Sequence, residues 1–406
     1  MVLKNAFVLK SWDDEIETLD VVVKDGTIVR LGRVDEDGLD LSGKLIMPPF
    51  YNTHTHAAMT LMRGVSDDDP FDVWLFEKVL PLEERLDGSM VYWGTMMAMM
   101  EMASRGIVAF VDMYFYLEDV IRAVLDFGMK AVITRGLVDS NGDDNRRLEE
   151  NLKAFERWHG ERGLVKVGLG PHSPYTCSMD YLMKISDIAR KNDMFVTMHV
   201  REAEWEKNKY DLEKILRIFD GVELLAVHMV HVDENEMDLL ESSGVKISHN
   251  PTSNLKLGNG IAPILEYTRR GIEVGLGTDG CASNNSLDLW HEMRTATLLQ
   301  KSNDPTSLNV ESSLRMATQN GAEITGFGSG KIEEGEPADL IVIDVEKPHY
   351  HPKNRIKSHL VHSGNSGDVF ATMVDGRWIY YDGEFPTVDE NEVLKNFERS
   401  VERLME

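Results

Sequence analysis

Cysteine is nearly absent from this chain of 406 residues, which contains only Cys177 and Cys281. Two cysteines so far apart do not make a disulfide framework, and they favour a reducing compartment. Long apolar runs are missing too, because no stretch approaches the roughly 18 apolar residues of a membrane-spanning helix. The first residues, MVLKNAFVLKSWDDE, lack a basic start followed by an apolar run, so no signal peptide is predicted. These absences predict a soluble, cytoplasmic protein.

Basic residues are scarce relative to acidic ones. Lysine and arginine number 43 against 69 aspartates and glutamates, which gives a formal net charge of −26. A surface this acidic repels phosphate backbones and anionic lipid head groups. Nucleic acid and membrane surfaces are therefore not expected as partners, and a small molecule is. The sequence leaves open whether copies of the chain form a homo-oligomer.

What the sequence does contain is an alternating pattern between residues 45 and 280. A short apolar, β-branched run ends on a polar residue, and a segment with helical spacing follows. The runs are 45–56, 106–113, 130–136, 165–173, 195–200, 224–230, 245–250 and 272–280. Strands that alternate with helices indicate an α/β fold with a parallel sheet. Eight repeats over about 240 residues predict a (β/α)8 barrel of the TIM type.

Both ends of the chain contain β-hairpin sequence outside this pattern. VVVKDGTIVRLG near the start and ATMVDGRWIYYDG near the end each place Asp-Gly between β-type runs. Because chain termini often lie close together, the economical arrangement is one small β-sandwich domain made from both ends. The predicted division is residues 1–44 and 335–406 for this composite domain, and 45–334 for the barrel.

Chemically active side chains gather at the ends of the predicted strands. In barrels of this type the site lies where the carboxyl ends of the strands meet. Those ends carry His54, His56, Asp112, Arg135, His172, His199, His228, His249 and Asp279. A lone strand-end histidine is usually a hydrogen-bonded structural residue, whereas several at one end of a barrel point to a metal. Asp112 and His249 also fit a role as caps or loop anchors.

Three of these histidines and one aspartate form the predicted metal site. His54 and His56 lie one residue apart, so on a strand both side chains point to the same face. His199 ends the fifth strand and Asp279 the eighth. Three imidazoles and a carboxylate are a ligand set for one divalent ion of the first transition row. Histidine favours zinc over magnesium or calcium, and iron and manganese stay open.

Two further residues are predicted to act beside the metal. Glu202 follows His199 by three residues, where its carboxylate can move a proton between water and a substrate. By itself such a glutamate would be read as a solvated loop residue. His228 ends the sixth strand and can hydrogen-bond to the water or to the substrate.

The motifs that carry these residues resemble those of the amidohydrolase superfamily. They are NTHTH, the His-x-x-Glu after the fifth strand, the strand-six histidine and GTDG, flanked by GKLIMPP and SGKIEEGEPADLIVID. Within the superfamily the chain is similar to the 5-methylthioadenosine/S-adenosylhomocysteine deaminases. That similarity lies in WLFEKVLPLEERL, TRGLVDSNGDD, GPHSPYTCS, SHNPTSNLKLGNGIAP and GTDGCASNNSLDLWHEMR, and it covers essentially the whole chain.

The resemblance implies an activity. It implies hydrolytic deamination of the adenine ring of S-adenosylhomocysteine, 5'-methylthioadenosine and related adenosines, which gives the inosine analogue and ammonia. Water replaces the amine, and Glu202 passes the water proton to the adjacent ring nitrogen. His228 and Asp279 hold the water, and Asp279 helps to protonate the leaving amine. The metal would be held by His54, His56, His199 and Asp279.

The resemblance also implies substrate contacts, at Glu83, Arg135, Arg147, His172, Glu202 and Asp279. The residue types fit, because a carboxylate such as Glu83 accepts both hydroxyls of a ribose. Arginines and a histidine bind the carboxylate of a homocysteine tail. Arg147 precedes Leu-Glu-Glu-Asn, as the family's arginine tends to, but Arg146 is one residue away, and the choice between them stays open.

Other interpretations compete with this one. Guanine, cytosine and triazine aminohydrolases belong to the same superfamily, but Glu83, Arg135 and Arg147 favour a ribosylated substrate with an anionic tail. A two-metal amidase resembling a dihydroorotase would carry a lysine at the end of strand four, where this chain has His172. A non-catalytic binding or assembly protein of the same fold would tend to lack metal ligands. The sequence does not determine which nucleoside is preferred.

Overall fold

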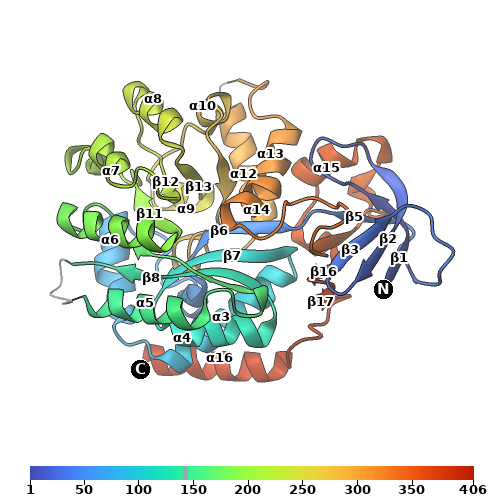
Figure 1. Ribbon diagram of the computed structural model, residues 1–406, viewed down its shortest axis with the longest axis horizontal. Coiled ribbons are helices and arrows are strands. Elements are labelled where there is room, and N and C mark those ends of the chain that lie inside the picture. The colour runs from blue at the N-terminus through green and yellow to red at the C-terminus, as the bar shows by residue number, and fades with distance from the viewer. Residues whose placement is uncertain (140–144, 303) are drawn as a thin grey trace.

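The computed structural model describes residues 1–139, 145–302 and 304–406. In this part of the chain the larger sheets are an eight-stranded sheet at one end of the molecule and two parallel sheets beside it (Figure 1). The eight-stranded sheet contains the blue and red strands from the two ends of the chain, and the parallel strands lie between them in sequence.

The eight-stranded sheet, called here the terminal sheet, has the order β17-β16-β15-β5-β1-β2-β3, with β4 paired to β1. Its strands are β1 (Val2–Val8), β2 (Glu17–Lys24), β3 (Thr27–Leu31), β4 (Leu39–Asp40), β5 (Lys44–Met47), β15 (Leu340–Asp344), β16 (Val369–Val374) and β17 (Arg377–Tyr381). β5 joins the two halves, because it runs parallel to β1 and antiparallel to β15. The two ends of the chain therefore share one sheet, as their hairpin sequences predict.

Asp-Gly pairs close two hairpins of the terminal sheet. Asp25 and Gly26 connect β2 with β3, and Asp375 and Gly376 connect β16 with β17. All four residues have φ between 45° and 80°. That conformation suits the right-handed twist of a two-residue hairpin, and Asp-Gly is one of the pairs that adopt it readily. The turn chemistry of the sequence thus predicts both hairpins.

The central strands are parallel and form two sheets. One has the order β10-β8-β7-β6, with β9 also paired to β8, and the other has the order β11-β12-β13-β14. Their bounds are β6 (Phe50–Thr55), β7 (Ile107–Tyr114), β8 (Lys130–Leu137), β9 (Val165–Val167), β10 (Gly170–Pro171), β11 (Val196–Val200), β12 (Leu224–His228), β13 (Lys246–His249) and β14 (Val274–Leu276). Each of the eight predicted runs contains a strand, which confirms the α/β alternation.

Backbone hydrogen bonds also join the two parallel sheets to each other. Leu169 forms an isolated parallel bridge with Val196, next to the start of β11. On the opposite side, the N–H groups of Thr278 and Asp279 donate to the carbonyl of His54 at 3.1 and 3.0 Å. These contacts link the last strand back to the first, which is the connection that a closed barrel requires.

The first predicted run, residues 45–56, turns out to be two strands in different sheets. β5 ends at Met47 and β6 begins at Phe50. Pro48 and Pro49 separate them, because proline has no N–H group for a strand ladder. The predicted division before residue 45 therefore cuts through β5, which belongs to the terminal sheet.

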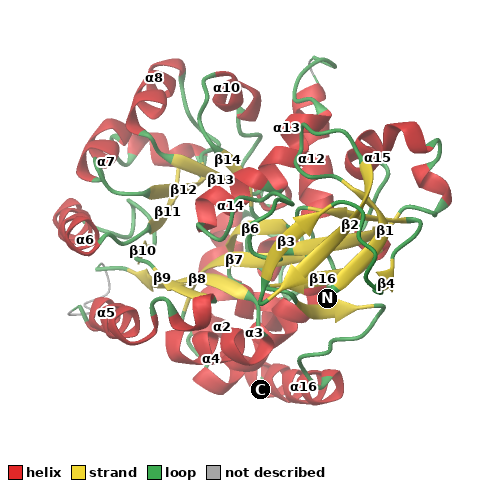
Figure 2. Cartoon of the chain, turned by 45° about the vertical axis from the view of Figure 1, so that its right-hand side comes forward, coloured by secondary structure: helices red, strands yellow, loops and turns green. Residues whose placement is uncertain are grey.

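Helices surround the parallel strands in Figure 2. The longer ones are α3 (Gly88–Ala103), α4 (Leu117–Phe127), α5 (Arg146–Trp158), α6 (Met179–Asn192), α7 (Leu212–Ile218), α8 (Glu234–Ser243), α12 (Leu289–Lys301), α13 (Val310–Ala317), α14 (Gln319–Thr325), α15 (Ile356–His362) and α16 (Glu390–Met405). The shorter ones are η1 (Ala57–Met62), α1 (Phe71–Val73), η2 (Trp74–Val79), α2 (Leu80–Glu83), η3 (Glu161–Gly163), η4 (Glu204–Asn208), α9 (Pro251–Lys256), α10 (Ile264–Arg269), α11 (Cys281–Asn284), η5 (Pro348–Tyr350), η6 (Lys353–Arg355) and η7 (Ser366–Asp368). In the described ranges no helix combines the length and the apolar character needed to cross a bilayer.

The last two helices of the chain, α15 and α16, pack outside the terminal sheet to which the predicted domain division assigns them. The sequence pattern assigns residues 335–406 to the composite β domain, whereas α16 packs against α3, and α15 packs against α12 and α13. Val393 and Leu404 of α16 are buried by this contact. An amphipathic helix buries its apolar stripe where a complementary surface is available, and here the helices around the parallel strands provide it.

A buried ion cluster connects the terminal sheet to the parallel strands. Nζ of Lys130, at the start of β8, lies 2.6 Å from Oδ2 of Asp339 and 2.7 Å from Oδ1 of Asp375. Lys130 and Asp339 are almost fully buried. Removing one member of a buried pair typically costs about 3–5 kcal/mol, because the other charge is left uncompensated. The cluster therefore holds the two parts of the chain in a fixed relation.

Candidate metal centre and substrate pocket

A cavity of about 870 Å³ lies at the carboxyl ends of the parallel strands. Its lining includes nine of the ten residues predicted to be functional, namely His56, Glu83, Arg135, Arg147, His172, His199, Glu202, His228 and Asp279. The tenth, His54, is fully buried beside them. The cavity has the size of a site for a small molecule. Asp112 and His249, the other strand-end residues, are not part of this lining.

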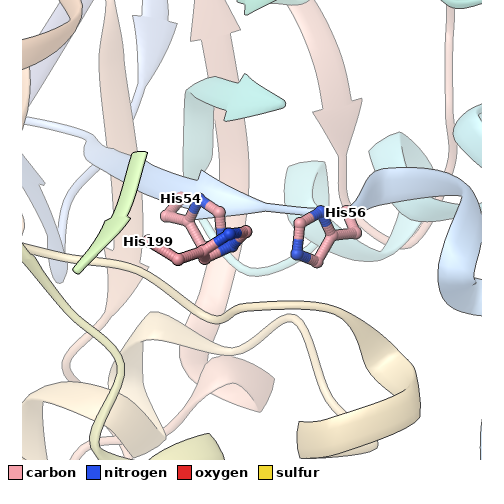
Figure 3. A group of neighbouring side chains, drawn as sticks. All are labelled: His54, His56 and His199. Carbon is pink, nitrogen blue, oxygen red and sulfur yellow. The ribbon is translucent and has the colours of Figure 1, made fainter. Parts of the chain in front are cut away.

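Three histidines come together at the inner end of the cavity. His54 belongs to β6, His56 directly follows it, and His199 belongs to β11, and their rings gather between these two strands (Figure 3). One nitrogen from each lies within 4.8 Å of the others. The Nε2 atoms of His54 and His199 are 3.2 Å apart. Strand alternation explains why His54 and His56 point the same way.

Asp279 lies against this group, and the four residues together form the candidate metal centre, called here the metal centre. Its Oδ1 lies 3.4 Å from Nε2 of His54 and 3.3 Å from Nε2 of His56. Tetrahedral zinc, with bonds of about 2.0–2.1 Å to nitrogen and oxygen, places its ligand atoms about 3.3–3.4 Å apart. The two distances from Oδ1 of Asp279, and the 3.2 Å between the Nε2 atoms of His54 and His199, are close to that spacing.

Backbone carbonyls fix the orientation of two of the imidazoles. Nδ1 of His56 donates to the carbonyl of Met113 at 2.6 Å, and Nδ1 of His199 donates to the carbonyl of His172 at 2.8 Å. With the proton on Nδ1, the lone pair on Nε2 points into the metal centre. Metal-binding histidines generally use their second nitrogen in this way.

Asp279 is held by two serines and by its backbone. Its Oδ2 accepts hydrogen bonds from Ser253 at 2.6 Å and from Ser283 at 3.0 Å, which leaves Oδ1 directed at the histidines. The residue has φ of +59°, a left-handed conformation, and is followed by Gly280. A Cβ atom at Gly280 would overlap Sδ of Met59 in η1, so a larger residue at this turn would have to displace the flexible Met59 side chain.

The pKa values of the metal-centre side chains also favour the binding of a cation. Burial lowers the pKa of His54 to about 4. Burial opposes the charged form of His56 as well, but the Asp279 carboxylate outweighs it and raises the pKa to about 9. The two imidazoles in turn hold the pKa of Asp279 well below its usual range despite burial. Without a metal the proton therefore stays on His56 beside the ionised Asp279, and a divalent ion bound here would displace it, because metal ligands must be deprotonated.

Glu202 and His228 face each other beside the metal centre. Oε2 of Glu202 lies 3.6 Å from Nε2 of His228, and Oε1 accepts a hydrogen bond from Nδ2 of Asn259 at 3.0 Å. Nδ1 of His228 donates to Oδ1 of Asn254 at 2.9 Å, so its Nε2 is left as an acceptor on the cavity side. Burial and the nearby charges of Asp279 and Glu206 raise the pKa of Glu202 well above its usual range. A carboxylate that takes up a proton this readily suits proton transfer.

The outer part of the cavity carries the residues predicted to contact the substrate. Burial raises the pKa of Glu83, at the end of α2, to about 7, although the charges of Arg135 and Arg147 act against the shift. Nε of Arg135 donates to Oε2 of Glu150 at 3.0 Å, and its guanidinium lies 4.7 Å from the ring centre of Phe115. Burial lowers the pKa of His172 to about 4. His172 is therefore neutral near pH 7 and offers a hydrogen bond rather than a charge.

The structure brings both candidate arginines to the cavity. Arg146 and Arg147 begin α5, and both contribute to the lining. The charge of Arg147 opposes the rise in the pKa of Glu83 and adds to the fall, caused chiefly by burial, in the pKa of His172. This electrostatic link to two predicted substrate contacts favours Arg147 over Arg146.

Sequence reasoning missed the residues that hold the functional side chains in place. Ser253 and Asn254 of α9 contact Asp279 and His228, Asn259 contacts Glu202, and Ser283 of α11 contacts Asp279. These polar residues belong to the stretches SHNPTSNLKLGNGIAP and GTDGCASNN, which carry the family resemblance. Their density of polar residues is the signal that could have pointed to them.

Known proteins match the chain over nearly its whole length. Residues 45–379 match the amidohydrolase family. The chain is 53% identical to a 5-methylthioadenosine/S-adenosylhomocysteine deaminase of Thermotoga maritima, over 98% of each chain. It is 38% identical to a 5'-deoxyadenosine deaminase of Methanosarcina mazei, over 100% of this chain and 98% of that one.

Among solved structures, the chain is similar to an adenosine deaminase from Xanthomonas campestris with bound zinc. The TM-score is 0.93 and the sequence identity is 27%, over 100% of this chain and 98% of that chain. The similarity therefore includes the terminal sheet as well as the parallel strands.

Proposed function

Because the chain belongs to the amidohydrolase family, we propose that it removes by hydrolysis the amino group of the adenine ring in S-adenosylhomocysteine, 5'-methylthioadenosine and related adenosines. The products are the inosine analogue and ammonia. The observation that carries the proposal is one cavity, beside a three-histidine metal-binding group, that is lined by the carboxylates of Glu83 and Glu202 and by three guanidinium groups. The relatives named above support the choice of an adenine nucleoside.

The proposal also covers the metal cofactor, the architecture of the two sheets and the cellular location. One divalent ion, zinc in preference to iron or manganese, would be held by His54, His56, His199 and Asp279. Such an ion supplies Lewis acidity and lowers the pKa of a water to about 7. We propose that the parallel strands close into a (β/α)8 barrel and that the terminal sheet folds into a small β-sandwich. The buried, unpaired cysteines support a cytoplasmic enzyme that acts on a small molecule.

Glu202 moves the proton in the proposed reaction. Its raised pKa lets the carboxylate accept a proton from the attacking water and pass it to the ring nitrogen beside the amine. Asn259 holds one oxygen of this carboxylate, so the other, next to His228, is the one that takes the proton. Positioned proton transfer of this kind contributes roughly 10²–10⁴-fold to a rate.

His228 and Asp279 orient the water and help the leaving group. The Nε2 atom of His228 is an acceptor, because Asn254 holds the proton on Nδ1. It therefore accepts a hydrogen bond from the water and directs an oxygen lone pair towards the ring carbon. Asp279, whose Oδ2 accepts hydrogen bonds from two serines, uses Oδ1 to take the second proton of the water oxygen, now bonded to the ring carbon, and to pass it to the departing amine.

The outer residues select a ribosylated substrate. Glu83 accepts the two ribose hydroxyls, and the arginines with His172 bind the carboxylate of a homocysteine tail. Methylthioadenosine has no such carboxylate, so this part of the cavity distinguishes the two substrates.

Ammonia release from a panel of substrates tests the function. The panel contains S-adenosylhomocysteine, 5'-methylthioadenosine, 5'-deoxyadenosine and adenosine, together with guanine, cytosine and an aminotriazine. The nucleosides are expected to exceed the free bases by at least about tenfold in kcat/KM, since each charge-assisted hydrogen bond contributes roughly 1.5–3 kcal/mol. Faster turnover of guanine, cytosine or the triazine would establish the rival aminohydrolase instead.

The pH dependence of kcat/KM should show whether the ionised form of Glu83 contributes to substrate binding. Its ionised form is the better acceptor for two hydroxyls, and its pKa is about 7. The ratio of wild-type to Glu83→Gln kcat/KM for 5'-methylthioadenosine is therefore expected to rise with pH and to level off above about 7. Taking the ratio removes titrations that both proteins share. A ratio that is flat from pH 5.5 to 8.5 (roughly the range in which a carboxyl of this pKa titrates) would contradict the ribose role.

Exchange of the two neighbouring arginines should separate their roles. Arg147→Ala is expected to lower kcat/KM for S-adenosylhomocysteine by about 10–100-fold, because a charged hydrogen bond is worth roughly 1.5–3 kcal/mol. The same variant should change turnover of 5'-methylthioadenosine by less than about threefold, since that substrate lacks the carboxylate. Arg146→Ala is the matched control. If the selective loss occurs in Arg146→Ala, the contact belongs to Arg146.

A further inference from the structure

The segment that carries Glu202 leaves β11 in an unfavourable backbone conformation. Arg201 lies between the strand and Glu202, and its φ is +55°, in the left-handed region. Residues other than glycine adopt this conformation only where surrounding contacts impose it. The direction in which Glu202 enters the cavity depends on this bend, so the contacts that impose it also determine where the Glu202 carboxylate lies.

Glu206 supplies those contacts. Glu206 is 1% exposed and belongs to η4, four residues after Glu202. Oε1 accepts the backbone N–H groups of Glu202 at 3.0 Å and of Ala203 at 2.9 Å, and Oε2 accepts the N–H of Arg201 at 2.9 Å. Three successive N–H groups thus converge on one side chain. Charge-assisted hydrogen bonds of this kind are about twice as strong as neutral ones.

Residues behind Glu206 hold it in place. The hydroxyl of Tyr210 donates to Oε2 of Glu206 at 2.5 Å and accepts the N–H of Arg201 at 2.8 Å. The Arg201 guanidinium lies 4.8 Å from the ring centre of Tyr210, donates to the backbone carbonyl of Glu206 at 2.9 Å and pairs with Glu236. Glu202 lines the cavity and Glu206 does not, so this network supports the site from outside.

Glu206 is the third residue of η4 and accepts the N–H of Ala203 at its N-cap, a stabilising role that glutamate commonly has at the start of a helix, and its hydrogen bonds from Arg201 and Glu202 exceed that role. Glu206 adds a second carboxylate within five residues of Glu202, and its charge contributes to the raised pKa of Glu202. Burying two acids together is costly unless each is fully hydrogen-bonded. Glu206 has four donors, and all of them lie on the loop between β11 and α7.

We propose that Glu206 is a positioning residue for the deamination, which acts by fixing the backbone of Glu202. It keeps one carboxylate oxygen of Glu202 on Asn259 and the other beside His228. The inference rests on the proton-transfer role given to Glu202 in the proposed function. Displacing a catalytic group by about 1 Å can cost on the order of 10²-fold in rate.

Four single variants test the proposal with 5'-methylthioadenosine as substrate. Glu206→Ala removes every acceptor and is expected to lower kcat by about 10–100-fold, with KM changed less than about threefold and metal content unchanged. Glu206→Gln keeps an oxygen that can serve Glu202 and Ala203, so its loss should be smaller. Glu204→Ala, an exposed acid of the same helix η4, is the matched control and should behave as wild type.

Tyr210→Phe separates positioning from stability. It removes the hydroxyl from Oε2 but leaves the hydrogen bonds from Glu202 and Ala203 to Oε1. Its Tm is expected to fall while kcat stays within about threefold of wild type, because the backbone of Glu202 keeps both contacts. A kcat that follows Tm across Tyr210→Phe, Glu206→Gln and wild type would instead assign Glu206 a purely structural role, and this comparison holds even if Glu206→Ala does not fold.

A double-mutant cycle with Glu202→Gln identifies the residue through which Glu206 acts. Once Glu202 no longer transfers protons, Glu206→Ala is expected to cause no additional loss of kcat. An undiminished loss in that background would overturn the proposal. Full turnover in Glu202→Gln alone would refute the role of Glu202 in the proposed function, whereas wild-type kcat in Glu206→Ala with an inactive Glu202→Gln would refute the positioning role only.

Discussion

Glutamine in place of Glu202 is expected to lower kcat for 5'-methylthioadenosine by about 10²–10⁴-fold. Glutamine has nearly the same shape and keeps an oxygen for Nδ2 of Asn259, so the hydrogen bond that orients the side chain is retained. What it loses is the ability to take up and release a proton. The pKa of Glu202 is raised, chiefly by burial, which makes proton uptake by the native side chain favourable.

Steady-state ammonia release and metal analysis of the same preparation check this result. The metal content should be unchanged, because Glu202 lies outside the metal centre formed by His54, His56, His199 and Asp279. Glu204→Gln changes the same chemical group at an exposed position two residues away and should keep wild-type kcat. Wild-type turnover in Glu202→Gln would remove this residue from the chemistry.

Removal of the metal should have a comparably large effect, on both activity and stability. Lewis acidity contributes several kcal/mol to reactions of this class, so turnover of the metal-free protein is expected to fall below about one hundredth of the initial value. A ligand that binds only the folded chain stabilises it by about 4 kcal/mol at a thousand times its Kd. The metal-free protein should therefore also unfold at a lower temperature.

Chelation, dialysis and return of zinc test this prediction. Added zinc should restore both kcat and Tm in the wild type. In Glu202→Gln it should restore Tm alone, because the metal centre is intact and the proton carrier is missing. Turnover that survives complete removal of metal would contradict the proposed chemistry.

Much of the site could be located from local sequence because its residues end strands. The alternation of apolar runs with helical segments predicts the α/β fold. In such a fold the residues of the active site lie at the carboxyl ends of the strands. His54 and His56 lie on β6 and just after it, and His199 lies on β11, where these patterns predict them. Glu83 and Arg147 lie outside the strands, so only the resemblance of their motifs to a known family could single them out.

Sequence patterns did not predict the place of a strand or helix where that place depends on a distant segment packed against it. Pro48 and Pro49 divide a run that reads as one strand, and the strand before them, β5, joins the terminal sheet because β1 and β15 lie on either side of it. α16 has an amphipathic pattern that fits many surfaces, and its place against α3 comes from the chain ends packing together.

Glu206 illustrates the same limit within the site. It lies in the segment EAEWEK, among three glutamates with the same side chain. Glu204 is exposed, whereas Glu206 is buried and its carboxylate accepts hydrogen bonds from three backbone N–H groups. No local pattern separates the two, because the difference arises from the bend at Arg201 and from the packing of Tyr210 against it.

The sequence by itself determined which segments are strands, which residues stand at their ends and to which family the chain is similar. Those properties depend on the periodicity and chemistry of residues that are neighbours in the sequence. Only the tertiary structure decided which polar groups are buried and what they contact, such as Ser253 with Asp279 and Glu206 with the backbone of Glu202. Burial depends on which distant segments pack together, and the free energy of a polar group depends on the partner it finds there.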